Sequence, residues 1–409
     1  MIERARRARL GQRLLRERAR AAKDRAPVVI VPALFGTRLR NGDGRMIWGA
    51  TSNVFFGPTI GGATGVQPAG LLEELPIIPG LVGQDIHGGL MRYLVDVGGY
   101  RRGEDLFSLD YDWREGVVHG AAQLEALVRS IRGVGAERVD LVGISSGGAV
   151  VRYFLAYGGA DVLGDAAVSL ATSPGAAWVR RVVYIGSPQR GTFGSPAHLH
   201  GGIVFIPGGK HFPASELALC QTPFDYLPHP DDPVFVNEKG DVLPLDIYDP
   251  ETWMKLGIAG GLKDIDVSDF DAHLKRGRRL HAALDRNGGA GRHPDTIVIG
   301  GRHMPTRARF LVAGGRAVLP DCDPPRKGGP MAQFTFVPGD GALPEASLRA
   351  VPGLEEDRLW LVTPKAHHLI PADPDVHRLL LEALLATDRR IPATPLPRRA
   401  LPVLSGDQA

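Results

Sequence analysis

The 409-residue sequence has only two cysteines, Cys220 and Cys322, and no long run of apolar residues. Two cysteines can form at most one disulfide, which excludes a disulfide framework and a cysteine-rich zinc module. A membrane-spanning helix needs about 18 or more consecutive apolar residues, and no stretch approaches that length. The N-terminal segment is charged and lacks the apolar core of a secretory signal, so we expect a cytoplasmic protein.

The chain also has little net charge, and its basic excess is confined to one end. The total is +3, whereas residues 1–26 carry ten Lys and Arg against three Asp and Glu, so the remainder carries −4. A mildly acidic body argues against a nucleic-acid partner. The arm has a helical pattern that ends at Pro27. It is typical of a solvated helix, and its charge would also suit anionic lipid headgroups, which would place the protein at a membrane surface.

Short apolar runs alternate with helical patterns along most of the chain. Strands that alternate with helices favour a mostly parallel sheet with helices on both faces, and therefore the α/β class. The predicted strands are 28–31, 105–109, 139–144, 182–185, 296–299 and 359–362, and the predicted helices are 88–97, 121–131, 147–156 and 376–385.

Two segments break this alternation. Residues 40–85 are rich in glycine and proline and are expected to be loop-like, and residues 189–294 are long and irregular. We interpret both as insertions above the sheet. The predicted organisation is a basic arm (1–26), one α/β domain that contains both insertions (27–388), and a tail rich in proline and arginine (389–409). Apolar residues of the first insertion that we expect to be exposed are Trp48, Phe55, Phe56, Leu71, Leu72, Leu75, Ile77 and Ile78.

The most informative motif is G-x-S-x-G, formed by Gly143, Ser145 and Gly147. A predicted strand precedes it and a predicted helix follows, which is the context that a nucleophilic serine on a tight turn requires. The alternative is an ordinary glycine-rich turn between a strand and a helix. In the catalytic interpretation, the backbone N–H of Ser146 would bind the oxyanion of the reaction.

A nucleophilic serine needs a histidine base and a carboxylate, which follow it along the chain in this arrangement. Asp340 lies in a glycine turn after an apolar run, and it is the candidate acid unless it only shapes that turn. His367 and His368 follow the last predicted strand, and one of them is the candidate base. The loop after the first strand offers the backbone N–H of Leu34 as the second oxyanion donor, although it could also be a plain turn.

Together these motifs resemble the lecithin:cholesterol acyltransferase-like family, which includes lysosomal phospholipase and phospholipid:diacylglycerol acyltransferase. Y-D-W-R combined with G-D-G-x-x-P is a specific signature, and the similar segments extend from about residue 27 to residue 385. The matching segments are 31–39 (VPALFGTRL), 106–114 (LFSLDYDWR), 141–148 (LVGISSGG), 185–192 (IGSPQRGT) and 339–348 (GDGALPEASL).

The resemblance implies an α/β-hydrolase fold with Ser145 as nucleophile, Asp340 as acid and His367 as base. His367 is preferred to His368 because an apolar residue, Ile370, follows it by three positions, as in the family. The family also implies that residues 40–85 and 189–294 form a lipid-contacting subdomain and a lid. It implies no cofactor and no catalytic metal.

The sequence departs from the family at three positions near the site. Ala33 replaces a usual glycine, and Ile144 and Ser146 replace the usual histidine and methionine or leucine. The triad needs none of these residue types, so the differences concern substrate preference. The missing secretory signal and disulfides mean that a plasma or lysosomal role does not transfer.

We therefore expect a serine-dependent lipid ester hydrolase or O-acyltransferase. Its partner would be a lipid or ester substrate, and the sequence specifies no oligomeric state. Two alternatives stay open. One is a soluble hydrolase of small esters or thioesters, and the other is a catalytically inactive hydrolase-fold binding protein.

Several other polar residues are interpreted as structural. His198, His200, His211 and residues 229–232 lack the spacing of a metal site, and residues 321–323 lack the spaced oxygen ligands of a calcium loop. We expect no metal there. Asp110, Asp112 and Trp113 follow an early strand, and we expect Trp113 to pack in the core and Arg114 to form an ion pair.

Overall fold

The computed structural model describes residues 2–22, 25–57, 59–78, 82–164, 175–205, 208–262, 265–286, 294–319, 331–362 and 366–386. Residues 321–323, Cys322 among them, and the tail over 389–409 lie outside these ranges. Cys220 is a buried free thiol. Within the described ranges, no helix is both long and apolar enough to span a bilayer.

A six-stranded sheet forms the centre of the molecule, with the strand order β18-β13-β9-β8-β1-β7. Every neighbouring pair in this sheet is parallel, so the predicted α/β class is confirmed. The strands β1 and β8 are buried along their whole length, which explains why they are continuous apolar runs rather than alternating ones. The bounds are β1 Val28–Val31, β7 Leu106–Ser108, β8 Val139–Ile144, β9 Val179–Ile185, β13 Asp295–Gly301 and β18 Leu359–Val362.

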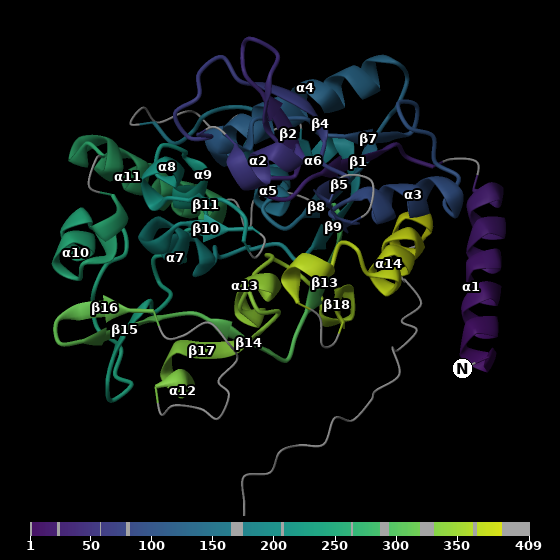
Figure 1. The fold of residues 1–409 in the computed structure, drawn as a ribbon. Coiled ribbons are helices and arrows are strands. Elements are labelled where there is room, and N and C mark those ends of the chain that lie inside the picture. Colours follow the sequence, from purple (N-terminus) through teal and green to yellow (C-terminus); the bar gives the residue numbers. More distant parts are fainter. Residues whose placement is uncertain are drawn as a thin grey trace, which may run out of the picture.

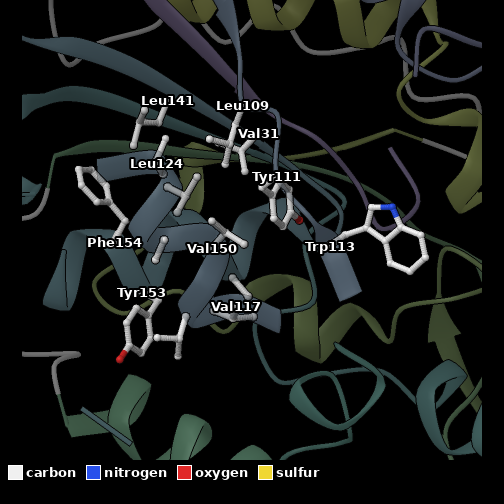
Figure 2. Close-up of a cluster of buried hydrophobic side chains, with 14 of the residues drawn as sticks. Val31, Leu109, Tyr111, Trp113, Val117, Leu124, Leu141, Val150, Tyr153 and Phe154 are labelled. Carbon is white, nitrogen blue, oxygen red and sulfur yellow. The ribbon is translucent and has the colours of Figure 1, made fainter. Parts of the chain in front are cut away.

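Helices cover both faces of this sheet (Figure 1). On one face, side chains of α4 and α5 pack against alternate residues of β1 and β8, and Figure 2 shows part of this cluster. On the other face, α3 and α14 pack against the remaining residues of the same strands. The helix α1 lies outside α14 at one edge of the molecule. The bounds are α1 Ile2–Ala21, α3 Gly88–Asp96, α4 Gly116–Gly133, α5 Gly147–Tyr157 and α14 Pro374–Leu385.

The segment 40–85 is not the loop that its composition predicts. It forms much of an antiparallel sheet with the order β3-β2-β4, then the hairpin β5–β6. Its glycines and prolines are compatible with this because many of them lie in the turns or on the sheet edges. The bounds are β2 Thr37–Arg40, β3 Met46–Trp48, α2 Thr51–Phe56, β4 Gln67–Leu71, β5 Glu74–Ile78 and β6 Val82–Asp85.

The expected exposure of this segment is wrong for most of its large side chains. Trp48, Leu72 and Leu75 are between 1% and 4% exposed, because they join the core cluster on the α4–α5 face, and Leu71 is buried as well. Phe55 is half-buried, whereas Phe56 is 89% exposed, as predicted. The side chains of Ile77 and Ile78 lie outside the described part of the structure.

The second insertion forms a layer with its own apolar core, which we call the cap. Phe224, Trp253 and Leu274 are fully buried in it. Phe310 on β15 joins the same core, so the cap also recruits residues beyond the predicted limit at 294. Its elements are α7 Gly194–Gly201, β10 Ile203–Val204, β11 His211–Phe212, α8 Ala214–Leu217, α9 Thr222–Asp225, β12 Phe235–Asn237, α10 Pro250–Lys255, η2 Ile258–Gly261, α11 Val267–Arg286, β15 Phe310–Ala313 and β16 Arg316–Val318.

Short elements complete the chain between these layers. The strands β14 (Met304–Arg307) and β17 (Phe336–Gly339) pair antiparallel beyond the end of β13. This pairing places the turn that follows β17 near the carboxyl edge of the central sheet. The remaining elements are η1 Trp113–Glu115, α6 Gly175–Trp178, α12 Ala332–Thr335, α13 Glu345–Arg349, η3 Glu356–Arg358 and η4 His367–Leu369.

Candidate active site

Ser145 lies on the tight turn between β8 and α5. Its φ of 49° is in the left-handed region, which non-glycine residues rarely adopt. Its N–H donates to the carbonyl of Ile185 at 2.8 Å, which holds the turn to β9. A side chain at Gly147 would overlap the Val31 carbonyl, and one at Gly143 would come within 2.7 Å of the helix backbone. The two glycines of the motif are therefore required by close packing of the backbone.

Three segments far apart in the sequence meet at this turn. The Ser145 hydroxyl lies 2.9 Å from Nε2 of His367, and Nδ1 of His367 lies 2.8 Å from Oδ2 of Asp340. A carboxylate can only accept, so Nδ1 carries the proton and Nε2 is free to accept from the serine hydroxyl. The arrangement is that of a nucleophile, a base and an orienting carboxylate.

The Asp340 carboxylate is fully buried and held by backbone donors. Its Oδ1 accepts from the N–H groups of Ala342 and Leu343, at 3.0 and 2.7 Å. The backbone of Gly341 has a φ of 94°, which explains the glycine after the acid. The Asp340 carbonyl also accepts from the His367 N–H at 2.9 Å. The turn thus fixes the carboxylate and the histidine loop together.

The two candidate bases differ in position. The His367 ring is half-buried between the serine and the aspartate, whereas His368 is exposed. Both belong to the short helix η4, in which neighbouring side chains point in different directions. The structure therefore brings His367, and not His368, to the serine.

The two predicted oxyanion donors are available. Within the described residues, neither the backbone N–H of Leu34 nor that of Ser146 has a hydrogen-bond acceptor. Ser146 immediately precedes α5, so the partial positive charge of that helix end adds to its N–H. Negative charge on a reacting carbonyl oxygen would be stabilised by such donors.

Two supporting residues were missed by the sequence analysis. The Tyr226 hydroxyl, from the cap, donates to the Ser146 carbonyl at 2.6 Å. Gly186 follows β9 and has a φ of 55°. It lies so close to His367 that a side chain at this position would touch the imidazole ring. Gly186 belongs to the segment 185–192 that marked the family resemblance, but no local pattern connects Tyr226 to Ser146.

The residues of the Y-D-W-R motif have the structural roles expected of them. Trp113 is buried and donates from Nε1 to the Thr37 carbonyl at 3.2 Å. Arg114 is buried and forms an ion pair with Asp112 at 2.6 Å. It also donates to two carbonyls of the first insertion, which ties that insertion to the sheet.

Three of the four histidines considered above for a metal site have hydrogen-bond partners in the structure. His200 and His211 each lie within 2.9 Å of a backbone carbonyl, and His229 lies 2.7 Å from the Asp285 carboxylate. Burial lowers the pKa of His198 to about 4. Over the described ranges, no group of three or more His, Cys, Asp or Glu side chains is arranged to hold a metal ion.

The parallel sheet, the serine turn after β8 and the late acid and histidine define the α/β-hydrolase fold. The family model described as lecithin:cholesterol acyltransferase matches residues 82–194. That range contains Tyr111–Arg114 and the serine turn, and it ends before Asp340 and His367. The predicted resemblance to this family is confirmed.

The structure of a chain in the Tle4–Tli4 complex supports the same fold. The chain is similar to a chain in the crystal structure of the Tle4–Tli4 complex, with 13% identity and a TM-score of 0.55, over 88% of this chain and 98% of that one. It also aligns with the mature form of Bacillus licheniformis lipase BlEst2, with 13% identity and a TM-score of 0.41, over 89% and 93% of the two chains. A sequence search of curated proteins finds no significant match.

Proposed function

We propose that the protein is a serine-dependent lipid ester hydrolase or O-acyltransferase. The observation that carries this proposal is the pair of contacts that connects Ser145 to His367 and His367 to Asp340, at 2.9 and 2.8 Å. The family match supports chemistry of the hydrolase or acyltransferase kind on lipid esters.

In the proposed reaction, Nε2 of His367 takes the proton of the Ser145 hydroxyl as its oxygen attacks the acyl carbonyl. Asp340 keeps the imidazole in the required tautomer and stabilises the imidazolium. The N–H groups of Leu34 and Ser146 bind the oxyanion of the tetrahedral intermediate. When this intermediate collapses, the imidazolium gives its proton to the leaving alcohol, and an acyl ester of Ser145 remains.

A second nucleophile then resolves the acyl-enzyme through the same steps in reverse. His367 takes a proton from water in a hydrolase, or from a lipid alcohol in a transferase, and the acyl group leaves Ser145. The two outcomes differ in whether water or the alcohol reaches the ester first, so the proposal covers both. The basic helix α1 would bring the enzyme to an anionic lipid surface, where such substrates lie.

The test is the intact mass of the protein after incubation with a phospholipid, with and without a long-chain alcohol. We expect an acyl adduct on the wild type and none on Ser145→Ala. Ser130→Ala serves as a matched control, because Ser130 is an exposed serine on α4 whose hydroxyl donates to the Leu127 carbonyl of the same helix. Faster release by the alcohol into a new ester would show a transferase, and release as free fatty acid would show a hydrolase.

A serine-reactive fluorophosphonate separates the alternatives. Labelling of Ser145 combined with turnover of short-chain esters only would replace the lipid assignment with a soluble esterase. A folded wild type that neither labels nor turns over any ester would overturn the enzymatic proposal in favour of a binding protein.

A further inference from the structure

The loop that carries Leu34 is held by side chains from three other parts of the chain. This loop connects β1 to β2. Trp48 donates from Nε1 to the Phe35 carbonyl at 2.7 Å, and Trp113 donates to the Thr37 carbonyl just beyond it. Phe35 has a φ of 65°, a conformation that persists only where the surroundings fix it.

The third of these side chains is His87, which follows the β5–β6 hairpin and precedes α3. Its Nδ1 lies 2.9 Å from the Leu72 carbonyl, and its Nε2 lies 3.4 Å from the backbone nitrogen of Ala33. The ring also packs so closely on Gly36 that a side chain there would lie 2.7 Å from it. His87 thus touches the loop on both sides of Leu34.

Only a neutral imidazole with its proton on Nδ1 can make both hydrogen bonds of His87. The Leu72 carbonyl is an acceptor, so Nδ1 must donate, and the Ala33 N–H is a donor, so Nε2 must accept. The side chain is 1% exposed, and this burial lowers its pKa, which favours the neutral form. The backbone of His87 is fixed as well, because its N–H and both neighbouring N–H groups donate to the Glu73 carbonyl.

Backbone hydrogen bonds also occupy the polar groups on either side of Leu34. The Ala33 carbonyl accepts from Gly36, and the Gly36 carbonyl accepts from Leu72, at 2.8 and 2.7 Å. Within the described residues, the Leu34 N–H has no acceptor. The loop is therefore pinned on both sides of a donor that stays available.

We infer that His87 is a positioning residue for the oxyanion donor Leu34, and that it acts by accepting the Ala33 N–H. This inference rests on the proposed function, because it matters only if an oxyanion forms at Ser145. If the donor turns away from the oxyanion, it stabilises the transition state less, whereas substrate binding is almost unchanged. Loss of the His87 acceptor should therefore lower kcat and leave KM nearly the same.

The test compares three substitutions by steady-state kinetics on a p-nitrophenyl ester. His87→Phe keeps a ring and loses both hydrogen bonds, and we expect kcat to fall about 10- to 100-fold, less than the effect of removing a donor. His87→Gln places an amide oxygen near the position of Nε2, and it should recover part of kcat. His87→Asn retains only a donor near the position of Nδ1, and it should resemble His87→Phe.

Inhibition by a trifluoromethyl ketone gives a second readout, because its hemiketal oxygen occupies the oxyanion site. The inhibition constant should rise across the variants in proportion to the loss of kcat. His200→Gln is the matched control, since Nδ1 of His200 also lies 2.9 Å from a backbone carbonyl, in the cap. It should change neither constant by more than about twofold.

The outcomes distinguish a failure of the proposed function from a failure of the proposed role of His87. Full activity of folded Ser145→Ala would refute the proposed function itself. If Ser145→Ala is inactive while folded His87→Phe and His87→Asn keep the wild-type kcat and inhibition constant, the role of His87 is wrong. If His87→Phe does not fold, the comparison of His87→Gln with His87→Asn decides, and equal kcat values for these two would contradict the acceptor role.

Discussion

At the residue scale, the backbone of Ser145 carries strain that its neighbours hold in place. A non-glycine residue at a φ of 49° costs on the order of 1–3 kcal/mol. The bond from its N–H to the Ile185 carbonyl and the packing of Gly143 and Gly147 offset this cost. The result is a side chain held at the end of β8, where His367 can reach it.

A comparison of the two adjacent histidines tests the proposed base. We expect His367→Ala to lower kcat/KM by on the order of a thousandfold or more, because the proton of Ser145 loses its acceptor. His368→Ala should stay within about threefold of the wild type, since His368 is exposed. Steady-state ester hydrolysis measures both effects. Equal losses for both variants, with melting temperatures like that of the wild type, would contradict the assignment.

At the scale of elements, the part of α1 whose side chains are described packs against α14 through one face. Leu15 and Ala19 are buried against the α14 face, and Arg18 donates to the carbonyl of Leu385 at the end of α14. Arg13, Arg16 and Arg20 are exposed on the same helix. The structure therefore leaves most of the described basic surface of α1 accessible.

We expect this surface to bind anionic bilayers. Replacement of Arg13, Arg16 and Arg20 by Gln should weaken binding to vesicles that contain phosphatidylglycerol by on the order of 100-fold, at about 1 kcal/mol for each basic residue. Co-sedimentation at low and high salt measures this, and high salt should reduce the wild-type binding. Binding is measured on the Ser145→Ala background, so that vesicle hydrolysis does not interfere.

A charge-matched variant controls for net charge in this experiment. Replacement of Lys275, Arg276 and Arg278 on α11 removes an equal amount of positive charge, three units, from another helix. That variant should bind vesicles as the wild type does. Equal loss in both variants would point to net charge, and binding of the wild type to neutral phosphatidylcholine vesicles with the same strength would refute an electrostatic contact.

At the scale of the whole molecule, a buried carboxylate connects the cap to the sheet domain. Asp225 on α9 accepts from the Val117 N–H near the start of α4, at 2.7 Å, and from the Gln221 side chain at 2.8 Å. Burial raises the pKa of Asp225 from 3.8 to about 6. The next residue, Tyr226, holds the Ser146 carbonyl, so this contact region lies beside the active site.

The raised pKa of Asp225 predicts how the free energy of unfolding depends on pH. Between pH 3.8 and about 6 the folded protein binds a proton that the unfolded chain has lost, so this residue's contribution to stability falls as pH rises. The full change is on the order of 3 kcal/mol. Asp225→Asn removes this contribution, so the variant should gain stability relative to the wild type as pH rises, measured as urea midpoints at pH 4.5 and 7.5.

An exposed aspartate provides the control for this pH effect. Asp96 lies at the end of α3 and is exposed, so Asp96→Asn should keep the wild-type dependence on pH. If Asp225→Asn and the wild type show parallel changes between the two pH values, the buried carboxylate is not protonated in the folded state and the prediction is wrong.

The sequence predicted the central fold well because buried parallel strands are continuous apolar runs. The predicted bounds of β1, β8 and β18 agree with the structure at every residue, and α5 differs by one residue at its end. The prediction was wrong for residues 40–85. There, Trp48 and Leu72 are buried by partners far away in the sequence, which composition cannot reveal.

The candidate site was likewise predictable from the sequence only in part. Ser145, Asp340 and His367 could be named from the sequence because each sits in a turn whose glycines or neighbours leave a local pattern. The sequence by itself thus determined the α/β architecture, the similarity to the acyltransferase family and the residues that could react. Only the tertiary structure decided that His367 rather than His368 faces the serine, and that His87 and Tyr226 hold the backbone around it. The reason is physical: a single hydrogen bond between distant segments depends on where both segments end in space, and it leaves no periodicity in either one.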